Sequence, residues 1–141
     1  MKVLQINTSL NSGSVGRIAS DIGDLLLSLG HESYIAYGRT FNESNSTAIK
    51  IGNKLDFLFH VINTRLFDRH GFSSRQATKK LVNEIVLLEP DIIHFHNLHG
   101  YYIHIGILLD FLSKVDKPIV WTFHDCWPFT GHCAYFDSAA C

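Results

Sequence analysis

Cysteine and proline are scarce in this sequence, and its net charge is close to zero. It has three prolines, and its three cysteines, Cys126, Cys133 and Cys141, lie within the last sixteen residues, which excludes a disulfide-built scaffold for most of the chain. Because the number of cysteines is odd, we expect thiols or metal ligands there rather than disulfides. Twelve basic and thirteen acidic residues give a formal charge of −1, which excludes the broad basic surface of a nucleic-acid-binding protein.

Long apolar runs are also absent. No stretch approaches the roughly 20 apolar residues that a transmembrane helix needs. Residues 1–7 contain one lysine and a very short apolar run, so they lack the apolar region of a secretory signal. We therefore expect a cytoplasmic protein, with peripheral attachment to the inner face of the membrane left open. The 141 residues have the length of one domain that buries a core of its own.

Strand-like and helix-like patterns alternate along the chain. Short apolar runs predict strands at residues 3–6, 33–37, 49–51, 91–95 and 118–123. Helical spacing predicts helices at residues 54–69, 75–88 and 104–112, and a first helix whose apolar face holds Ile18, Ile22, Leu25, Leu26 and Leu29 before Gly30 ends it. The alternation predicts an α/β fold, a Rossmann-like parallel sheet with helices on both faces.

Three polar loops follow predicted strands, at residues 7–16, 96–100 and 124–127. Ligands of open parallel sheets bind beyond the carboxyl ends of the strands, where the strand order reverses. We therefore expect the functional residues to come together at this edge. The loop 11–16 (Asn-Ser-Gly-Ser-Val-Gly) precedes a helix, whose free N–H groups attract a phosphate, although a plain turn is the alternative for this short motif.

The nine histidines suggest a metal site, with His94, His96, His99, His124 and His132 close to the cysteines in sequence or in the predicted fold. The period of a strand argues against a simple site, because His94 and His96 would share one face while Phe95 points to the other. We expect His94 to be a hydrogen-bonded structural histidine.

The predicted helix 54–69 and the residues after it are unusually rich in phenylalanine. Phe57, Phe59, Phe67 and Phe72 occur near Arg65 and Arg69, a combination found on surfaces that touch membranes. Packing of these phenylalanines in the core is the alternative, and it is the one we expect.

Two stretches resemble a known family most closely: residues 90–97 (Pro-Asp-Ile-Ile-His-Phe-His-Asn) and residues 121–133 (Trp-Thr-Phe-His-Asp-Cys-Trp-Pro-Phe-Thr-Gly-His-Cys). Residues 3–8, 13–17, 30–32 and 64–71 add to the likeness. On these motifs the chain resembles the N-terminal domain of the GT-B fold glycosyltransferases of family 4, especially bacterial capsule and exopolysaccharide enzymes of the colanic-acid type.

The resemblance implies a retaining glycosyltransferase that moves a sugar from a UDP- or GDP-sugar to a saccharide or lipid-linked acceptor, with no metal or other cofactor required. It implies that His124 contacts the donor sugar near the reacting carbon and that Asp125 orients the turn. The residues expected to approach the donor diphosphate are Gly13, Ser14, Gly16 and Arg17. Those expected on the acceptor side are His96, Asn97, His99, Tyr101 and Tyr102.

Family members also have a second Rossmann-like domain, which binds most of the nucleotide sugar and carries a Glu-x₇-Glu element. We therefore expect residues 1–141 to form a single acceptor-side N-terminal domain that is inactive alone, with the donor-binding C-terminal domain absent from this chain. Two alternatives stay open: a metal-binding interaction domain that uses histidine and cysteine, and a nucleotide-binding Rossmann module of another kind.

Overall fold

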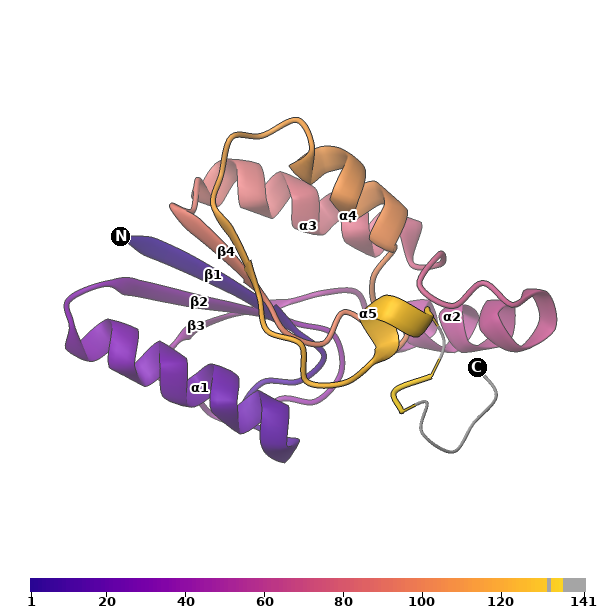
Figure 1. The fold of residues 1–141 in the computed structure, drawn as a ribbon, viewed down its shortest axis with the longest axis horizontal. Coiled ribbons are helices and arrows are strands. Elements are labelled where there is room, and N and C mark those ends of the chain that lie inside the picture. Colours follow the sequence, from indigo (N-terminus) through magenta and orange to yellow (C-terminus); the bar gives the residue numbers. More distant parts are fainter. Residues whose placement is uncertain (132, 136–141) are drawn as a thin grey trace.

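The computed structural model describes residues 1–131 and 133–135, and a five-stranded parallel sheet lies at its centre (Figure 1). The strands are β1 (Lys2–Asn7), β2 (Glu32–Tyr37), β3 (Thr47–Lys50), β4 (Ile92–Phe95) and β5 (Ile119–Trp121). The helices are α1 (Gly13–Ser28), α2 (Lys54–Phe67), α3 (Arg75–Leu88), α4 (Ile105–Leu112) and α5 (Trp127–Thr130). The short helix α5 was not expected from the sequence.

The strand order is β3-β2-β1-β4-β5, so the direction of strand addition reverses between β1 and β4. In the register Ile6 pairs with Phe95, and Phe95 pairs with Trp121. The loops that follow β1 and β4 therefore begin side by side, as expected for the edge at which parallel α/β sheets bind ligands.

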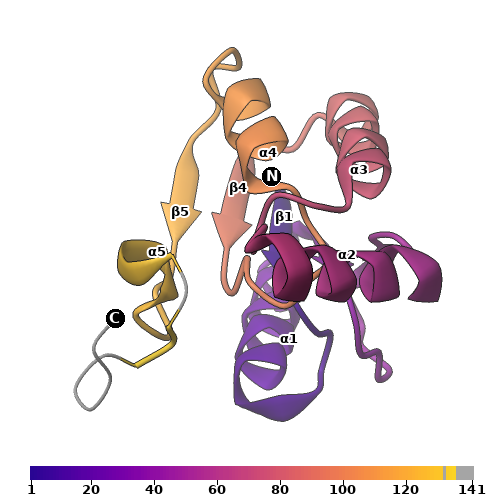
Figure 2. The ribbon, with the colours of Figure 1, turned by 90° about the vertical axis from the view of Figure 1, so that its right-hand side faces the viewer.

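Helices cover both faces of the sheet, which confirms the predicted α/β class. Figure 1 places α1 on one face and α3 with α4 on the other, while Figure 2 shows α2 crossing in front of the carboxyl ends of the strands. The larger apolar cluster lies on the α3–α4 side, where Leu4, Ile93 and Phe95 pack with Leu81 and Leu108. Helix α2 covers neither face.

Helix α1 packs against the sheet through small residues rather than through the predicted apolar stripe. Its buried residues are Gly16, Ala19, Ser20 and Gly23, whereas Ile18, Leu25 and Leu29 are exposed. A side chain at Gly23 would collide with Ser46, so the close approach requires glycine. The end of the helix is as predicted: Gly30 has φ +76°, and His31 N–H donates to Leu26 O at 2.9 Å in a Schellman motif.

Helix α2 differs most from expectation. It begins with a capping box, in which the Asn53 side chain accepts from the backbone N–H of Asp56 while the Asp56 carboxylate accepts from Asn53 N–H. Its one buried residue is His60. Core packing is wrong for Phe59, Phe67 and Phe72, which are all more than half exposed. The reason is that α2 lies at the edge of the sheet, where the described residues pack mainly against one side of the helix.

Candidate functional site

The loops after β1 and β4 are tied together by polar side chains at the point of strand reversal. Asn7 Oδ1 accepts from the backbone N–H of Asn97 at 3.3 Å, and the Thr8 hydroxyl lies 2.6 Å from His99 O. Gly100 completes this contact, since it has φ +116° and a Cβ there would approach Thr8 Cγ2 to 2.7 Å. The two loops therefore form one connected edge.

A chain of hydrogen bonds runs from the middle of β1 to His124, which follows β5. Gln5 Nε2 donates to Ala19 O at 2.9 Å, so Gln5 Oε1 faces His96 Nε2 at 2.9 Å. His96 therefore carries its hydrogen on Nε2, and its Nδ1 accepts from His124 Nε2–H at 2.9 Å. In neutral His124 the lone pair then lies on Nδ1, so the buried relay selects the tautomer of His124, the residue that the resemblance implies contacts the donor sugar.

The surroundings of these histidines favour the neutral form. Burial and, to a smaller extent, the nearby His94 and His124 together lower the pKa of His96 to about 3. The pKa of His124 is lowered by burial, an effect that the charge of Asp125 opposes. His94 and His96 share one strand face with ring centroids 4.2 Å apart, and His94 Nε2 pairs with the Thr122 hydroxyl at 2.8 Å, as expected for a structural histidine.

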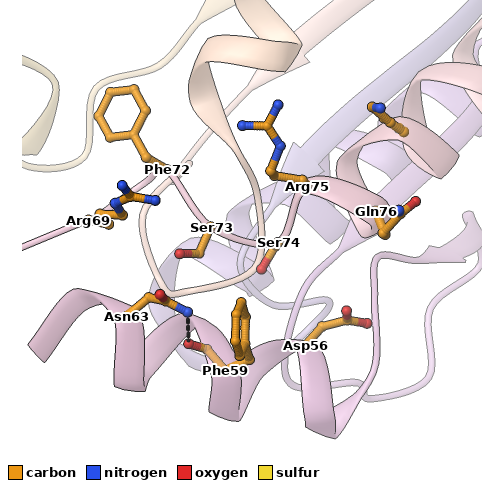
Figure 3. A pocket seen from close by; sticks show the side chains of 10 residues that line it. Asp56, Phe59, Asn63, Arg69, Phe72, Ser73, Ser74, Arg75 and Gln76 are labelled. Atoms are coloured by element: carbon orange, nitrogen blue, oxygen red, sulfur yellow. Dashed lines mark hydrogen bonds between the residues drawn. The ribbon is translucent and has the colours of Figure 1, made fainter. Parts of the chain in front are cut away.

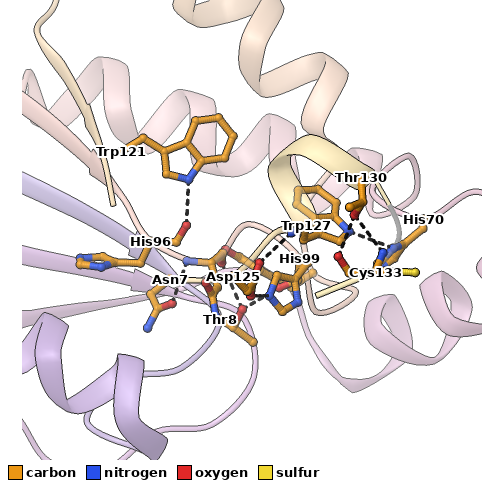
Figure 4. Close-up of polar contacts among 12 residues, drawn as sticks. Asn7, Thr8, His70, His96, His99, Trp121, Asp125, Trp127, Thr130 and Cys133 are labelled. Carbon is orange, nitrogen blue, oxygen red and sulfur yellow. Dashed lines mark hydrogen bonds and ion pairs between the residues drawn. The ribbon is translucent and has the colours of Figure 1, made fainter. Parts of the chain in front are cut away.

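Asp125 joins two of the three polar loops. Its Oδ2 lies 2.7 Å from His99 Nε2, and its Oδ1 accepts from the backbone N–H of Trp127 at 3.0 Å. The indole N–H of Trp127 in turn donates to His70 Nδ1 at 3.1 Å. Figure 4 shows these contacts beside Asn7 and Thr8. Asp125 thus connects the segment that carries His124 to the loop after β4.

The residues predicted on the acceptor side have different degrees of exposure. The His96 side chain is buried, with 1% exposed, and it reaches the surface only through His124. Tyr102 is 3% exposed and its hydroxyl donates to Asn97 O at 2.7 Å, so its ring cannot stack on a sugar in this structure. Tyr101, in contrast, is partly exposed, and its unusual φ of +66° directs it toward α2.

The glycine motif expected as a loop is instead the first turn of α1. Gly13, Ser14, Gly16 and Arg17 all lie within the helix, and Ser14 and Arg17 are exposed. The preceding loop packs closely on Gly16, where a Cβ would lie 2.8 Å from Ser9 Oγ. No acidic residue occurs in the first turn, and Ser12 makes no side-chain cap among the described contacts. The positive end of the helix dipole, at the N-terminal N–H groups of α1, is therefore not neutralised by an acidic side chain of the first turn.

The cysteines differ from expectation in one case. Cys126 is a free thiol, but Cys133 is disulfide-bonded, so the expectation of a thiol or metal ligand is wrong for Cys133. His132 and Cys141 lie outside the described residues. Within residues 1–131 and 133–135, no group of three histidine, cysteine or acidic side chains is placed to hold a metal ion.

The residues that support the predicted site were not predicted from the sequence. The side chain of Gln5 is fully buried. A polar residue inside an otherwise apolar strand needs a hydrogen-bond partner, and this is the signal in the sequence that could have identified Gln5. Asn7 and Thr8 follow the same strand directly. No comparable signal marks His70, since only the folded chain brings it to Trp127.

The sequence resembles known proteins over most of its length. The model of the family described as Glycosyltransferase Family 4 matches residues 15–139. The chain belongs to glycosyltransferase family 4. It is also 28% identical over 149 residues to an Escherichia coli protein named "Putative colanic acid biosynthesis glycosyl transferase WcaC". That match covers 97% of this chain and 36% of the relative, so the chain spans about a third of the relative's length.

In this family 4 chain, the described residues include no helix long and apolar enough to cross a membrane.

Proposed function

We propose that the protein containing this chain is a retaining glycosyltransferase of cell-surface polysaccharide synthesis, and that residues 1–141 form its acceptor-side N-terminal domain in a GT-B arrangement. The single observation that carries the proposal is the Gln5–His96–His124 relay, at the strand-reversal edge of a chain that belongs to glycosyltransferase family 4. A second domain would complete the donor site. The donor is a UDP- or GDP-sugar.

The proposed reaction needs no metal. The bond between the anomeric carbon and the diphosphate breaks, and the acceptor hydroxyl oxygen bonds to that carbon with retained configuration. The hydroxyl proton leaves with the nucleoside diphosphate. Negative charge develops on the departing diphosphate, and the N-terminal N–H groups of α1 with Arg17 are the groups of this chain proposed to stabilise it.

His124 is proposed to hold the donor sugar beside the reacting carbon. Its Nε2–H is committed to His96, so its Nδ1 is the atom proposed to accept a hydrogen bond from a sugar hydroxyl. Asp125 acts on His124 as a positioning residue, because its carboxylate binds both His99 and the first N–H of α5.

The acceptor saccharide is proposed to bind on the side of Tyr101. A cavity of about 530 Å³ at the carboxyl ends of β2 and β3 is lined by Arg39, Lys50 and Phe57 among others. Phe57 links it to Tyr101, with ring centroids 6.0 Å apart. Arg39 lies over the Phe57 ring, with its guanidinium carbon 4.8 Å from the ring centroid, so the cavity combines an aromatic ring with basic and amide groups. That combination suits a sugar, which has apolar faces and polar edges.

The test is transfer by the complete protein from a panel of UDP- and GDP-sugars to saccharide and lipid-linked acceptors, with the product followed by mass. We expect transfer with one donor class, and a loss of about a hundredfold in kcat for His124→Ala. His31→Ala is the matched control, since His31 lies just before β2 at the opposite edge of the sheet, and its activity should be unchanged.

Two results would overturn the proposal. One is unchanged transfer by His124→Ala, which would remove His124 from the site. The other is turnover by residues 1–141 alone, because the proposal places most of the donor contacts in a second domain.

A further inference from the structure

A cavity between α2 and the start of α3 has no part in the proposed transfer reaction. Its volume is about 400 Å³, within the range of sites that bind small ligands. Figure 3 shows that its side chains come from α2, from the segment that carries Arg69, Phe72 and Ser73, and from the first turns of α3. None of the residues predicted at the donor or acceptor sites lines it.

The N-terminus of the 14-residue helix α3 borders this cavity. Arg75 and Gln76, its first two residues, both line the cavity. The backbone N–H groups of Arg75, Gln76 and Ala77 have no acceptor among the described residues, as is usual in the first turn of a helix. The first turn has no acidic residue, and Ser74 makes no side-chain cap among the described contacts. The positive end of the helix dipole is therefore available to an anion.

Ser73 gives a second and independent indication of a ligand. It is 5% exposed and lines the cavity, yet its hydroxyl forms no hydrogen bond within the part of the chain that the structure describes. Buried hydroxyls normally have a partner, because an unpaired one costs free energy. The neighbouring Ser74 hydroxyl is already 2.8 Å from His60 Nδ1. The Ser73 hydroxyl is therefore placed to donate to a ligand in the cavity.

Three basic side chains line the same cavity. Arg69, Arg75 and Lys79 are exposed, and none of them forms an ion pair with a described residue. Asp56 is the acidic residue of the lining, so the formal charge of the lining is +2. Its Oδ2 accepts from Asn53 N–H at 2.9 Å in the capping box of α2. Arginine side chains match the geometry of phosphate oxygens, so the cavity favours a phosphate group.

Aromatic and amide groups form the rest of the lining. Phe59 and Phe72 are 63% and 55% exposed, so both rings are accessible to a ligand. Asn63 Nδ2 donates to Phe59 O at 2.8 Å, which leaves Asn63 Oδ1 to accept from a ligand hydroxyl. Gln76 adds a second amide. Rings and amides beside the basic groups suit a sugar, which has apolar faces and hydroxyl edges.

We propose that this cavity is a second ligand site, which binds a sugar phosphate. The phosphate accepts hydrogen bonds from the N-terminal N–H groups of α3 and from the Ser73 hydroxyl, and the three basic side chains balance its charge. The sugar ring packs on Phe59 or Phe72 and is held by the amides.

His60 lies between this second site and the proposed acceptor side. Its Nδ1 pairs with the Ser74 hydroxyl, and its ring packs against Tyr101 with centroids 5.8 Å apart. The two sites are therefore neighbours with separate linings. Binding at the second site does not depend on the proposed transfer reaction.

The experiment is isothermal titration of the complete protein with glucose 1-phosphate, with inorganic phosphate and glucose as comparison ligands. We expect glucose 1-phosphate to bind at least about tenfold more tightly than either comparison ligand, because each of them lacks one half of the contacts. Ser73→Ala should weaken the binding about tenfold through the lost hydrogen bond to the phosphate. Its thermal midpoint without ligand should not fall, since the hydroxyl has no partner among the described residues.

Lys79 and Lys80 provide a matched pair of variants. Both are exposed on α3, but Lys79 lines this cavity, whereas Lys80 lines a different one beside β3. Lys79→Gln should weaken binding about fivefold, while Lys80→Gln should bind like the unmodified protein. His124→Ala should also bind glucose 1-phosphate unchanged, because His124 belongs to the transfer site.

Four results would overturn the proposal. Two are a failure of glucose 1-phosphate to bind and an equal affinity for inorganic phosphate. The third is full binding by Ser73→Ala or equal effects of the two lysine variants, which would place the ligand elsewhere. The fourth is loss of binding in His124→Ala, which would place the ligand at the transfer site.

Discussion

Acid should destabilise the folded chain through two buried histidines, His60 and His96. Burial lowers the pKa of His60 to about 4 and that of His96 to about 3, from the usual value of 6.5. Because the unfolded chain binds these protons first as the pH falls, the stability is complete above about pH 6.5 and decreases below it. At about pH 5, some 1.5 units lower, each histidine should cost about 2 kcal/mol, since one unit corresponds to about 1.4 kcal/mol.

The assay is urea unfolding followed by tryptophan fluorescence at about pH 8 and about pH 5. The two histidines together should remove about 4 kcal/mol, a large part of the roughly 5–15 kcal/mol that stabilise a typical domain. The variant His60→Asn keeps a polar group near Ser74 but has no titrating ring, so it should lose about half of this pH dependence.

Ser74→Ala is the control for the contact itself. It removes the hydrogen-bond partner of His60 while the ring remains, so stability should fall at both pH values and the dependence on pH should persist. Equal pH dependence in the unmodified protein and in His60→Asn would refute the reasoning, because it would show that His60 is not held neutral in the folded state.

Two other substitutions test the packing beneath the candidate site. Gly16→Ala places a methyl group 2.8 Å from Ser9 Oγ and 3.3 Å from Ser9 O, so urea unfolding should show a loss of about 1–3 kcal/mol. Ser14→Ala in the same turn is exposed and should change stability by less than about 0.5 kcal/mol, and equal effects of the two would contradict the close contact. Gln5→Leu leaves the buried His96 Nε2–H without its acceptor and should also cost about 1–3 kcal/mol. Its transfer rate should fall toward that of His124→Ala, and a full rate would show that the relay does not position His124.

The order of the strands and of helices α1 to α4 was predictable because each of these elements has a local signal, which the short helix α5 lacks. Helix α3 has the predicted bounds, Arg75–Leu88, since Pro90 excludes the helical conformation of the residue before it. Strand β4 lies within the predicted residues 91–95, and Gly30 ends α1 as expected. The placement of the loops after β1 and β4 at one edge was also predicted, because parallel strands align their carboxyl ends.

The faces of the helices were not predictable in the same way. Apolar periodicity in α1 and α2 correctly indicates amphipathic helices, but it does not say whether protein, solvent or another surface meets the apolar side. In α1 the small residues Gly16 and Gly23 allow a closer approach to the sheet than the leucines would. In α2 the outer face is only partly covered by the described residues, so Phe59 and Phe67, which were predicted in the core, are exposed.

The candidate site was predicted in part. His96, His99, His124 and Asp125 were identified from loops and resemblance, and the structure brings them into two hydrogen-bonded pairs. Their roles toward donor and acceptor stay predictions.

The sequence by itself determined the α/β class, the order of elements and the edge at which polar loops gather. These follow from side-chain periodicity and from turn residues, which act over a few positions of the chain. Only the tertiary structure decided that Gln5 fixes the tautomer of His96, that Tyr102 is buried while Tyr101 is not, and that most of the large apolar side chains of α2 are exposed. Those outcomes depend on contacts between residues far apart in the chain, such as Gln5 and His96. No local sequence pattern specifies the geometry of such contacts.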